Sequence, residues 1–187
     1  MWEHVQTLRP LLEGLERRGE RPALLAFSRA GCRSWSFSGL AAESKRLAQG
    51  LRAAGIGPGD PVALWAGPGP EWILVCLGII AAGAVVVPLD TQFPERTLVQ
   101  VLEDSKTRLI FTERKKSSRL TELPMHPPPA IALLDAGEGD PASWRRYCAE
   151  QGAQVPAPQP DDTVALFYTS GTTGPPKGVP LTQRNLA

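Results

Sequence analysis

Short, continuous runs of apolar residues alternate with helical patterns from Asp60 onward. A parallel sheet covered by helices on both faces is typical of this pattern, because its strands are buried on both sides. Five runs are the strand candidates: residues 62–65, 85–87, 109–111, 131–134 and 164–168. The pattern therefore predicts an α/β fold, with a partial doubly wound, mainly parallel sheet flanked by helices. Ligands of such sheets bind beyond the carboxyl ends of the strands.

Helical spacing of apolar residues precedes the sheet. A surface helix near the N-terminus is predicted by four leucines: Leu8, Leu11, Leu12 and Leu15. A second helix has Ser38 available as its N-cap and stops at Gly55, where glycine takes a left-handed conformation. Its expected buried positions are Leu40, Leu47, Leu51 and Ala54. We therefore divide the chain into an N-terminal helical region, 1–58, and an α/β subdomain, 59–187, which is a fragment of a larger domain.

Local signals place the remaining elements. Two helices are expected to begin at 70–71 and 94–95, each with proline in the first turn and glutamate after it. The basic run 114–116 is interpreted as a solvated turn. Proline-rich stretches at 123–129 and 156–160 are interpreted as loops flanking a short strand and a helix around Trp144.

One apolar stretch, 73–89, has 17 residues without a charge, which is close to the lower limit for a membrane span. Gly83 and Pro88 interrupt it, and its second half is β-branched, so a buried helix followed by a buried strand is the better interpretation. The start of the chain lacks the layout of a secretion signal. We therefore expect a cytoplasmic protein without a transmembrane span.

Charge and cysteine content exclude several classes of function. Lysine and arginine total 20 against 19 aspartates and glutamates, so a net charge of +1 gives no field that would attract nucleic acid. The three cysteines are widely spaced and only two histidines accompany them. This inventory fits neither a disulfide framework nor a zinc cluster.

The segment 169–178, directly after the last predicted strand, is dense in hydroxyls and glycines and contains Lys177 near its end. Glycines let backbone N–H groups converge on an anion, hydroxyls add donors, and lysine adds a positive charge. A Walker A loop needs glycine before the lysine and serine or threonine after it, but Pro176 and Gly178 occupy these positions. The residues alone thus indicate a phosphate-binding loop of another kind, or a flexible turn that leads from a strand to a helix.

The string at 168–179, Tyr-Thr-Ser-Gly-Thr-Thr-Gly-Pro-Pro-Lys-Gly-Val, resembles the AMP-binding signature of adenylate-forming ligases. This family includes acyl-CoA synthetases, luciferases and the adenylation domains of peptide synthetases. The segments 35–40, 59–64 and 80–90 are similar to further family elements and follow in the same order, so the likeness covers nearly the whole chain. Two positions depart from the pattern. The segment 67–70 stands where the family usually has an asparagine, and Gln183 stands where it commonly has a histidine, whose role in shaping the acyl pocket is therefore not carried over.

The resemblance implies a reaction in two steps. A carboxylate attacks the α-phosphorus of ATP and pyrophosphate leaves; a thiol, usually that of coenzyme A, then takes the acyl group. Matched residue by residue, the contacts to the ATP phosphates would be Thr169, Ser170, Gly171, Thr172, Thr173, Gly174 and Lys177. Thr169 would neighbour the Mg²⁺ ion, and Lys177 would be the catalytic residue.

The family places its adenine-binding aromatic motif, its ribose-binding aspartate and its C-terminal catalytic lysine beyond position 187. We therefore expect an N-terminal fragment of a ligase that does not catalyse by itself. An acyl-CoA synthetase acting on a fatty or similar carboxylic acid is the leading hypothesis. The alternatives are an adenylation domain that loads a carrier protein, and a noncatalytic module that binds a nucleotide or a protein partner.

Overall fold

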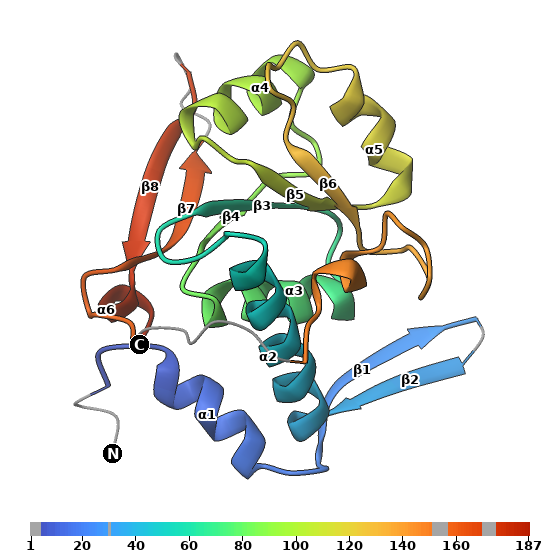
Figure 1. Cartoon of the computed structure of the whole chain (residues 1–187), viewed down its shortest axis with the longest axis vertical. Helices are drawn as coiled ribbons and strands as arrows, with labels where there is room; N and C mark the ends of the chain where they lie inside the picture. The colour runs from blue at the N-terminus through green and yellow to red at the C-terminus, as the bar shows by residue number, and fades with distance from the viewer. Residues whose placement is uncertain (1–4, 30, 151–156, 170–174) are drawn as a thin grey trace.

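A six-stranded sheet forms the centre of the molecule in the computed structural model of the protein, which describes residues 5–29, 31–150, 157–169 and 175–187. The strand order is β6-β5-β3-β4-β7-β8 (Figure 1). The strands are β3 (Pro61–Trp65), β4 (Val85–Pro88), β5 (Leu109–Thr112), β6 (Ala130–Leu133), β7 (Thr163–Thr169) and β8 (Lys177–Thr182). All neighbouring strands are parallel except β7 and β8. The predicted mainly parallel sheet is confirmed, with all five expected strands in it.

Helices cover both faces of this sheet. On one face α2 (Phe37–Ala53) and α3 (Pro70–Ala81) pack against alternate strand residues such as Val62 and Leu64. On the other face α4 (Glu95–Asp104) and α5 (Arg114–Thr121) pack against Ala63 and Trp65. Successive residues of β3 thus enter two separate cores, because side chains alternate across a strand. Figure 1 shows these two layers above and below the sheet, which confirms the doubly wound arrangement.

The two predicted N-terminal helices are present with changed details. Helix α1 (Arg9–Arg17) has no buried residue, as expected of a surface helix. Helix α2 is capped by Ser36 and not by Ser38, because the Ser36 hydroxyl accepts a hydrogen bond from the Gly39 amide at 3.0 Å. Ala54 is the C-cap and is exposed, in contrast to the prediction. Gly55 follows it with a φ of +78°, the left-handed conformation predicted for it.

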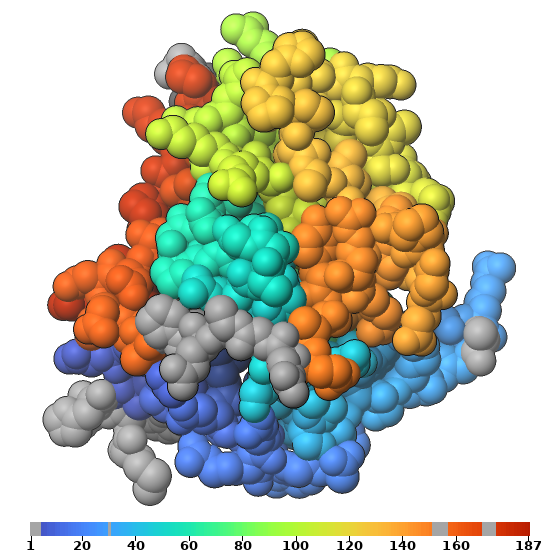
Figure 2. Space-filling view, in the orientation of Figure 1, coloured from blue at the N-terminus to red at the C-terminus, as the bar shows by residue number. Residues whose placement is uncertain are grey.

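An antiparallel hairpin that the sequence did not predict lies between these helices. It consists of β1 (Pro22–Ser28) and β2 (Gly31–Ser36), and it projects from the body of the molecule (Figure 2). Its outer side chains are exposed, including Phe27 at 79%. The region 1–58 therefore contains a hairpin as well as helices, while the boundary at 58 remains a prediction.

Several local predictions have a clear outcome. The basic run 114–116 opens α5 and is not a turn; the Arg114 amide donates to the Asp135 carboxylate at 2.9 Å at the start of this helix. The stretch 73–89 divides into α3 and β4, as predicted, and no helix among the described residues is both long and apolar enough to cross a bilayer. Pro70 is the first residue of α3, whereas Pro94 is the N-cap of α4. A short 3-10 helix, η1 (Trp144–Tyr147), stands where a helix was expected around Trp144.

Candidate functional site

The two described ends of the glycine-rich segment lie side by side. Thr169 ends β7, Lys177 begins β8, and the two residues are partners in the antiparallel ladder. Five of the predicted phosphate contacts lie outside the described residues: Ser170, Gly171, Thr172, Thr173 and Gly174. Their roles stay predictions. Thr169 and Lys177 are brought together at the carboxyl end of β7, the edge that the fold class predicts for ligands.

The β7–β8 hairpin has two unlike faces, because cross-strand partners share a face and successive residues alternate. Thr169 and Lys177 share one face with the partners Phe167 and Val179, which are 46% and 43% exposed. The opposite face carries Tyr168, which packs with the core around α4. Among the described residues, no ion pair involves Lys177. The open face therefore presents a hydroxyl and an ammonium group without an acidic partner in the described part of the chain.

A hollow of about 640 Å³ lies beside Thr169 at the carboxyl edge of the sheet. The segments that follow β3 and β4, the first turn of α3 and the end of β7 surround it. Its lining includes Ala66, Pro68, Trp72, Asp90, Phe93 and Phe167. A volume of this size falls in the range of small-molecule pockets. Sequence reasoning assigned no role to these lining residues.

Hydrogen bonds from buried side chains fix the rim of this hollow. The Trp65 indole N–H donates to the Asp90 carbonyl at 3.1 Å, which joins the end of β3 to the segment after β4. The hydroxyl of Thr112, at the end of β5, donates to the Trp65 carbonyl at 2.8 Å. Three strand ends are thus connected directly, so the hollow stands on rigid elements.

Glu113 secures the segment 67–70, where the chain departs from the family pattern. Its carboxylate accepts hydrogen bonds from the Lys116 ammonium and the Gly67 amide, and its side chain is 24% exposed. The Lys116 hydrogen bond, the positive charges of Lys116 and Lys115 and the Gly67 amide together lower the pKa of Glu113 below its ordinary value. The acid therefore stays ionised at neutral pH and holds the loop after β3.

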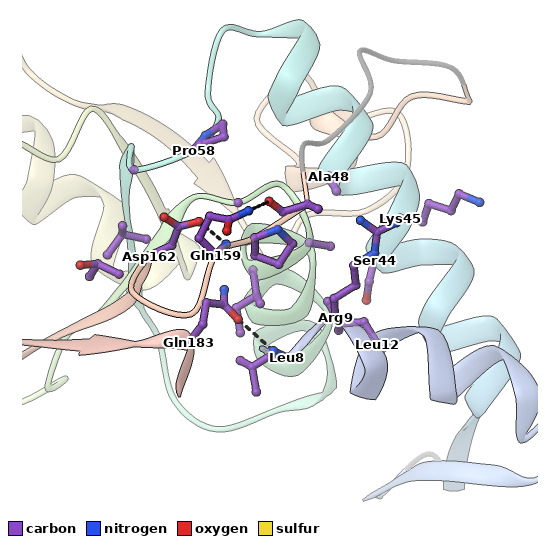
Figure 3. Close-up of a pocket in the computed structure, with 18 of the residues that line it drawn as sticks. Leu8, Arg9, Leu12, Ser44, Lys45, Ala48, Pro58, Gln159, Asp162 and Gln183 are labelled. Atoms are coloured by element: carbon purple, nitrogen blue, oxygen red, sulfur yellow. Dashed lines mark hydrogen bonds between the residues drawn. The ribbon is translucent and has the colours of Figure 1, made fainter. Parts of the chain in front are cut away.

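A larger groove of about 1280 Å³ lies at the opposite edge, where β3, β4 and β7 begin (Figure 3). Helices α1 and α2 form its other wall, and α6 (Gln183–Leu186) closes one end. Gln183 is only 3% exposed, and its side-chain oxygen accepts a hydrogen bond from the Leu8 amide at 2.9 Å. This residue thus ties the N-terminal segment to α6 at the edge opposite Thr169 and Lys177. Neither Thr169 nor Lys177, the two predicted phosphate contacts that the structure describes, lines the larger groove.

Comparison with known proteins decides the family. A model of the AMP-binding enzyme family matches residues 12–187. The chain belongs to the AMP-binding enzyme family. The expected resemblance to adenylate-forming ligases, over nearly the whole chain, is confirmed.

Curated relatives in this family differ in the acceptor that their names give. A fatty acid–[acyl-carrier-protein] ligase of Streptomyces coeruleorubidus is 35% identical over 82% of this chain and 29% of its own length. A sulfoacetate–CoA ligase of Cupriavidus necator is 37% identical over 81% of this chain and 30% of its own length. Tyrocidine synthase 3 of Brevibacillus parabrevis is 34% identical over 97% of this chain and 3% of its own length. The chain thus spans less than a third of each of these relatives.

Solved structures show the same fold. An acyl-CoA synthetase of Brucella canis matches with a TM-score of 0.74 and 29% identity, over 88% of this chain and 31% of that chain. An O-succinylbenzoate–CoA synthetase of Bacillus subtilis, solved with AMP, matches with a TM-score of 0.73 and 28% identity, over 91% and 41% of the two chains.

Proposed function

We propose that this chain is the N-terminal segment of an ATP-dependent, AMP-forming ligase that adenylates a carboxylic acid, most simply a fatty acid, and transfers the acyl group to coenzyme A. Membership of the AMP-binding enzyme family supports the adenylation step. The observation that carries the proposal is the pairing of Thr169 with Lys177 across the hairpin, at the carboxyl edge of the sheet.

Each of these residues has a separate role in the proposed reaction. The carboxylate oxygen bonds to the α-phosphorus of ATP while the bond to pyrophosphate breaks, so negative charge accumulates on the departing phosphates. The Lys177 ammonium would stabilise that charge, and the segment 170–174 would add backbone and hydroxyl donors. Lys177 acts electrostatically and takes no proton from the substrate.

Mg²⁺ enters this reaction together with ATP, and its chemistry is to neutralise phosphate oxygens. Thr169 fits a position beside such an ion, because its hydroxyl is a neutral oxygen on the open face of the hairpin next to Lys177. One hydroxyl is too few to hold the ion without the nucleotide. Thr169 would therefore bind Mg²⁺ only as part of the ATP complex.

Carboxylate-dependent exchange of pyrophosphate into ATP tests the adenylation step in the full-length protein. We expect Lys177→Ala to lower the exchange rate by about 10²–10³, the loss typical of one donor to a developing anion. Lys45→Ala is the matched control, because Lys45 lies on α2 beside the opposite groove and is exposed. Equal exchange in the wild type and Lys177→Ala would refute the role of Lys177.

A carrier protein is the second candidate for the acceptor, since one relative is named as a ligase of the acyl carrier protein and another as a peptide synthase. The acyl-adenylate is common to both reactions, so pyrophosphate exchange does not separate them. Purified ligase with ATP and fatty acid should be offered either coenzyme A or a carrier protein that bears phosphopantetheine. Acyl transfer to coenzyme A alone supports the first candidate, and transfer to the carrier protein alone supports the second.

A further inference from the structure

Tyr168 contacts both described ends of the glycine-rich segment. It directly precedes Thr169 in β7, and its partner across the ladder is Gly178, which directly follows Lys177 in β8. Its side chain points to the face opposite Thr169 and Lys177, where it packs against the core that α4 completes. Tyr168 is therefore placed to influence both proposed phosphate ligands from the opposite face of the hairpin.

The tyrosine ring covers Gly178. A Cβ atom at Gly178 would lie 3.3 Å from Cε1 and Cζ of Tyr168, and 3.1 Å from Cδ1 of Leu166. Such distances are tighter than ordinary van der Waals contact, so a side chain at 178 would push the ring aside. An aromatic residue opposite a glycine of an edge strand shields the backbone of that strand and pins the register of the pair. The register of this pair sets Thr169 opposite Lys177.

The hydroxyl of the same ring is anchored on a helix. Tyr168 Oη donates a hydrogen bond of 2.6 Å to Oδ2 of Asp104, the last residue of α4. A carboxylate at the C-terminus of a helix is unfavourable to the helix dipole, and the last turn of α4 has no basic residue to offset it. Asp104 therefore does not stabilise α4 through the helix dipole. Its hydrogen-bond partner is Tyr168 of β7.

The anchor itself is rigid. Leu98, Val101 and Leu102 of α4 have no exposed surface and belong to the core that the Tyr168 ring joins. Partial burial and the Asp104 carboxylate both raise the pKa of Tyr168, so its hydroxyl keeps the proton and remains a donor at physiological pH.

We propose that Tyr168 is a positioning residue, which uses its hydrogen bond to Asp104 and its contact with Gly178 to hold Thr169 and Lys177 in the arrangement that receives the ATP phosphates. This inference rests on the proposed function. It adds that helix α4, on the face of the sheet opposite Thr169 and Lys177, controls how these two residues are placed.

The experiment compares the two tyrosines of the chain in the full-length ligase. Tyr168→Phe removes only the hydroxyl, and we expect the KM for ATP to rise by about tenfold or more, the effect of one hydrogen bond to a charged group. The KM for the carboxylic acid should stay unchanged. Tyr147→Phe is the matched control, since the Tyr147 hydroxyl accepts a hydrogen bond from Arg146 at 3.1 Å, away from the hairpin. We expect its KM for ATP to equal that of the wild type.

A double substitution tests the pairing with Asp104. Asp104→Ala should reproduce the effect of Tyr168→Phe, and the double variant should be no worse than either, because all three lose the same hydrogen bond. Gly178→Ala tests the second contact independently and should also raise the KM for ATP. Wild-type KM for ATP in Tyr168→Phe, or an equal rise for both substrates, would overturn the inference.

Failure of this inference and failure of the proposed function give different results. If Lys177→Ala abolishes pyrophosphate exchange but Tyr168→Phe has the kinetics of the wild type, only the positioning role is wrong. If Lys177→Ala leaves exchange intact, the proposed function of the hairpin is wrong.

Discussion

Strand β3 and the β7–β8 hairpin belong to the same sheet and differ in what surrounds them. β3 is paired on both sides, and its residues Val62, Ala63, Leu64 and Trp65 are fully buried. β8 lies at the sheet edge, and its first four residues are exposed. The inner strands therefore carry the stability of the fold. The hairpin presents its side chains on an open face and carries the proposed chemistry.

The largest expected effect tests the stability side of this comparison. Phe111→Ala, in β5, removes a side chain with no exposed surface and should lower the free energy of unfolding by about 3–5 kcal/mol. Phe167→Ala, in β7, removes one that is 46% exposed and should cost less than about 1 kcal/mol. Urea unfolding of both variants measures the difference. Equal losses would contradict the division between inner strands and hairpin.

Thiol reactivity tests whether helix α3, which covers β3, stays closed in the native protein. Burial raises the pKa of Cys76 in α3 from 9.0 to about 11. The thiolate fraction at pH 8 is therefore about 100-fold lower than in the unfolded chain, and alkylation should slow by at least this factor. Mass spectrometry after timed exposure to iodoacetamide follows the reaction, with the exposed Cys32 as an internal control. Rapid modification of Cys76 under native conditions would show that this layer opens.

The functional side of the comparison concerns the two ends of β7. Thr169→Val removes the hydroxyl proposed to neighbour Mg²⁺ and should lower kcat/KM for ATP about tenfold, with little change in stability. Thr163→Val makes the same change at the opposite end of the strand, beside the larger groove. This control should retain wild-type kinetics. Similar losses in both variants would argue against a special role for the carboxyl edge.

The smallest effect concerns Glu113, which links the inner strand β5 to the loop after β3. Because its folded-state pKa lies below the ordinary 4.5, its stabilisation is present above about pH 4.5 and disappears as the pH falls through the folded-state pKa. Glu113→Gln should cost about 0.5–1 kcal/mol at pH 7 and progressively less in acid. Unfolding curves between pH 7 and pH 3 measure this, with the exposed Glu122→Gln as control. A difference that grows in acid would mean that the pKa shift has the opposite sign.

The same contrast explains which elements the sequence predicts. Five strands were found because their buried runs are continuously apolar. β8 was missed because Gly178 and Pro180 resemble a loop, and because its exposed side chains leave no apolar pattern. The β1–β2 hairpin is a different case, because residues 23–27 of β1 are continuously apolar although Leu25 and Phe27 are 55% and 79% exposed. An apolar run therefore does not by itself tell a buried strand from an exposed one.

Site residues follow a related rule. Thr169 and Lys177 were predicted from a local signature, and the structure pairs them across the hairpin, while their role as phosphate ligands stays a prediction. Tyr168 stood in the same signature, but its link to Asp104 joins residues 64 positions apart and needs the fold to be seen. The sequence prediction placed the N-cap of α2 at Ser38 and not at Ser36, because both serines precede the apolar positions of this helix. Contacts between distant segments leave no pattern in either segment alone.

The position of β7 beside β4 has a consequence for how the chain is made. Residues 61–133 supply four adjacent strands, but the outer edge of β4, with its valines at 85–87, gains its neighbour only when residues 163–169 have been synthesised. Until then an apolar strand edge is open to pairing with other chains. A nascent or truncated polypeptide that ends before residue 163 would therefore expose the unpaired edge of β4. It would depend on chaperones to avoid aggregation.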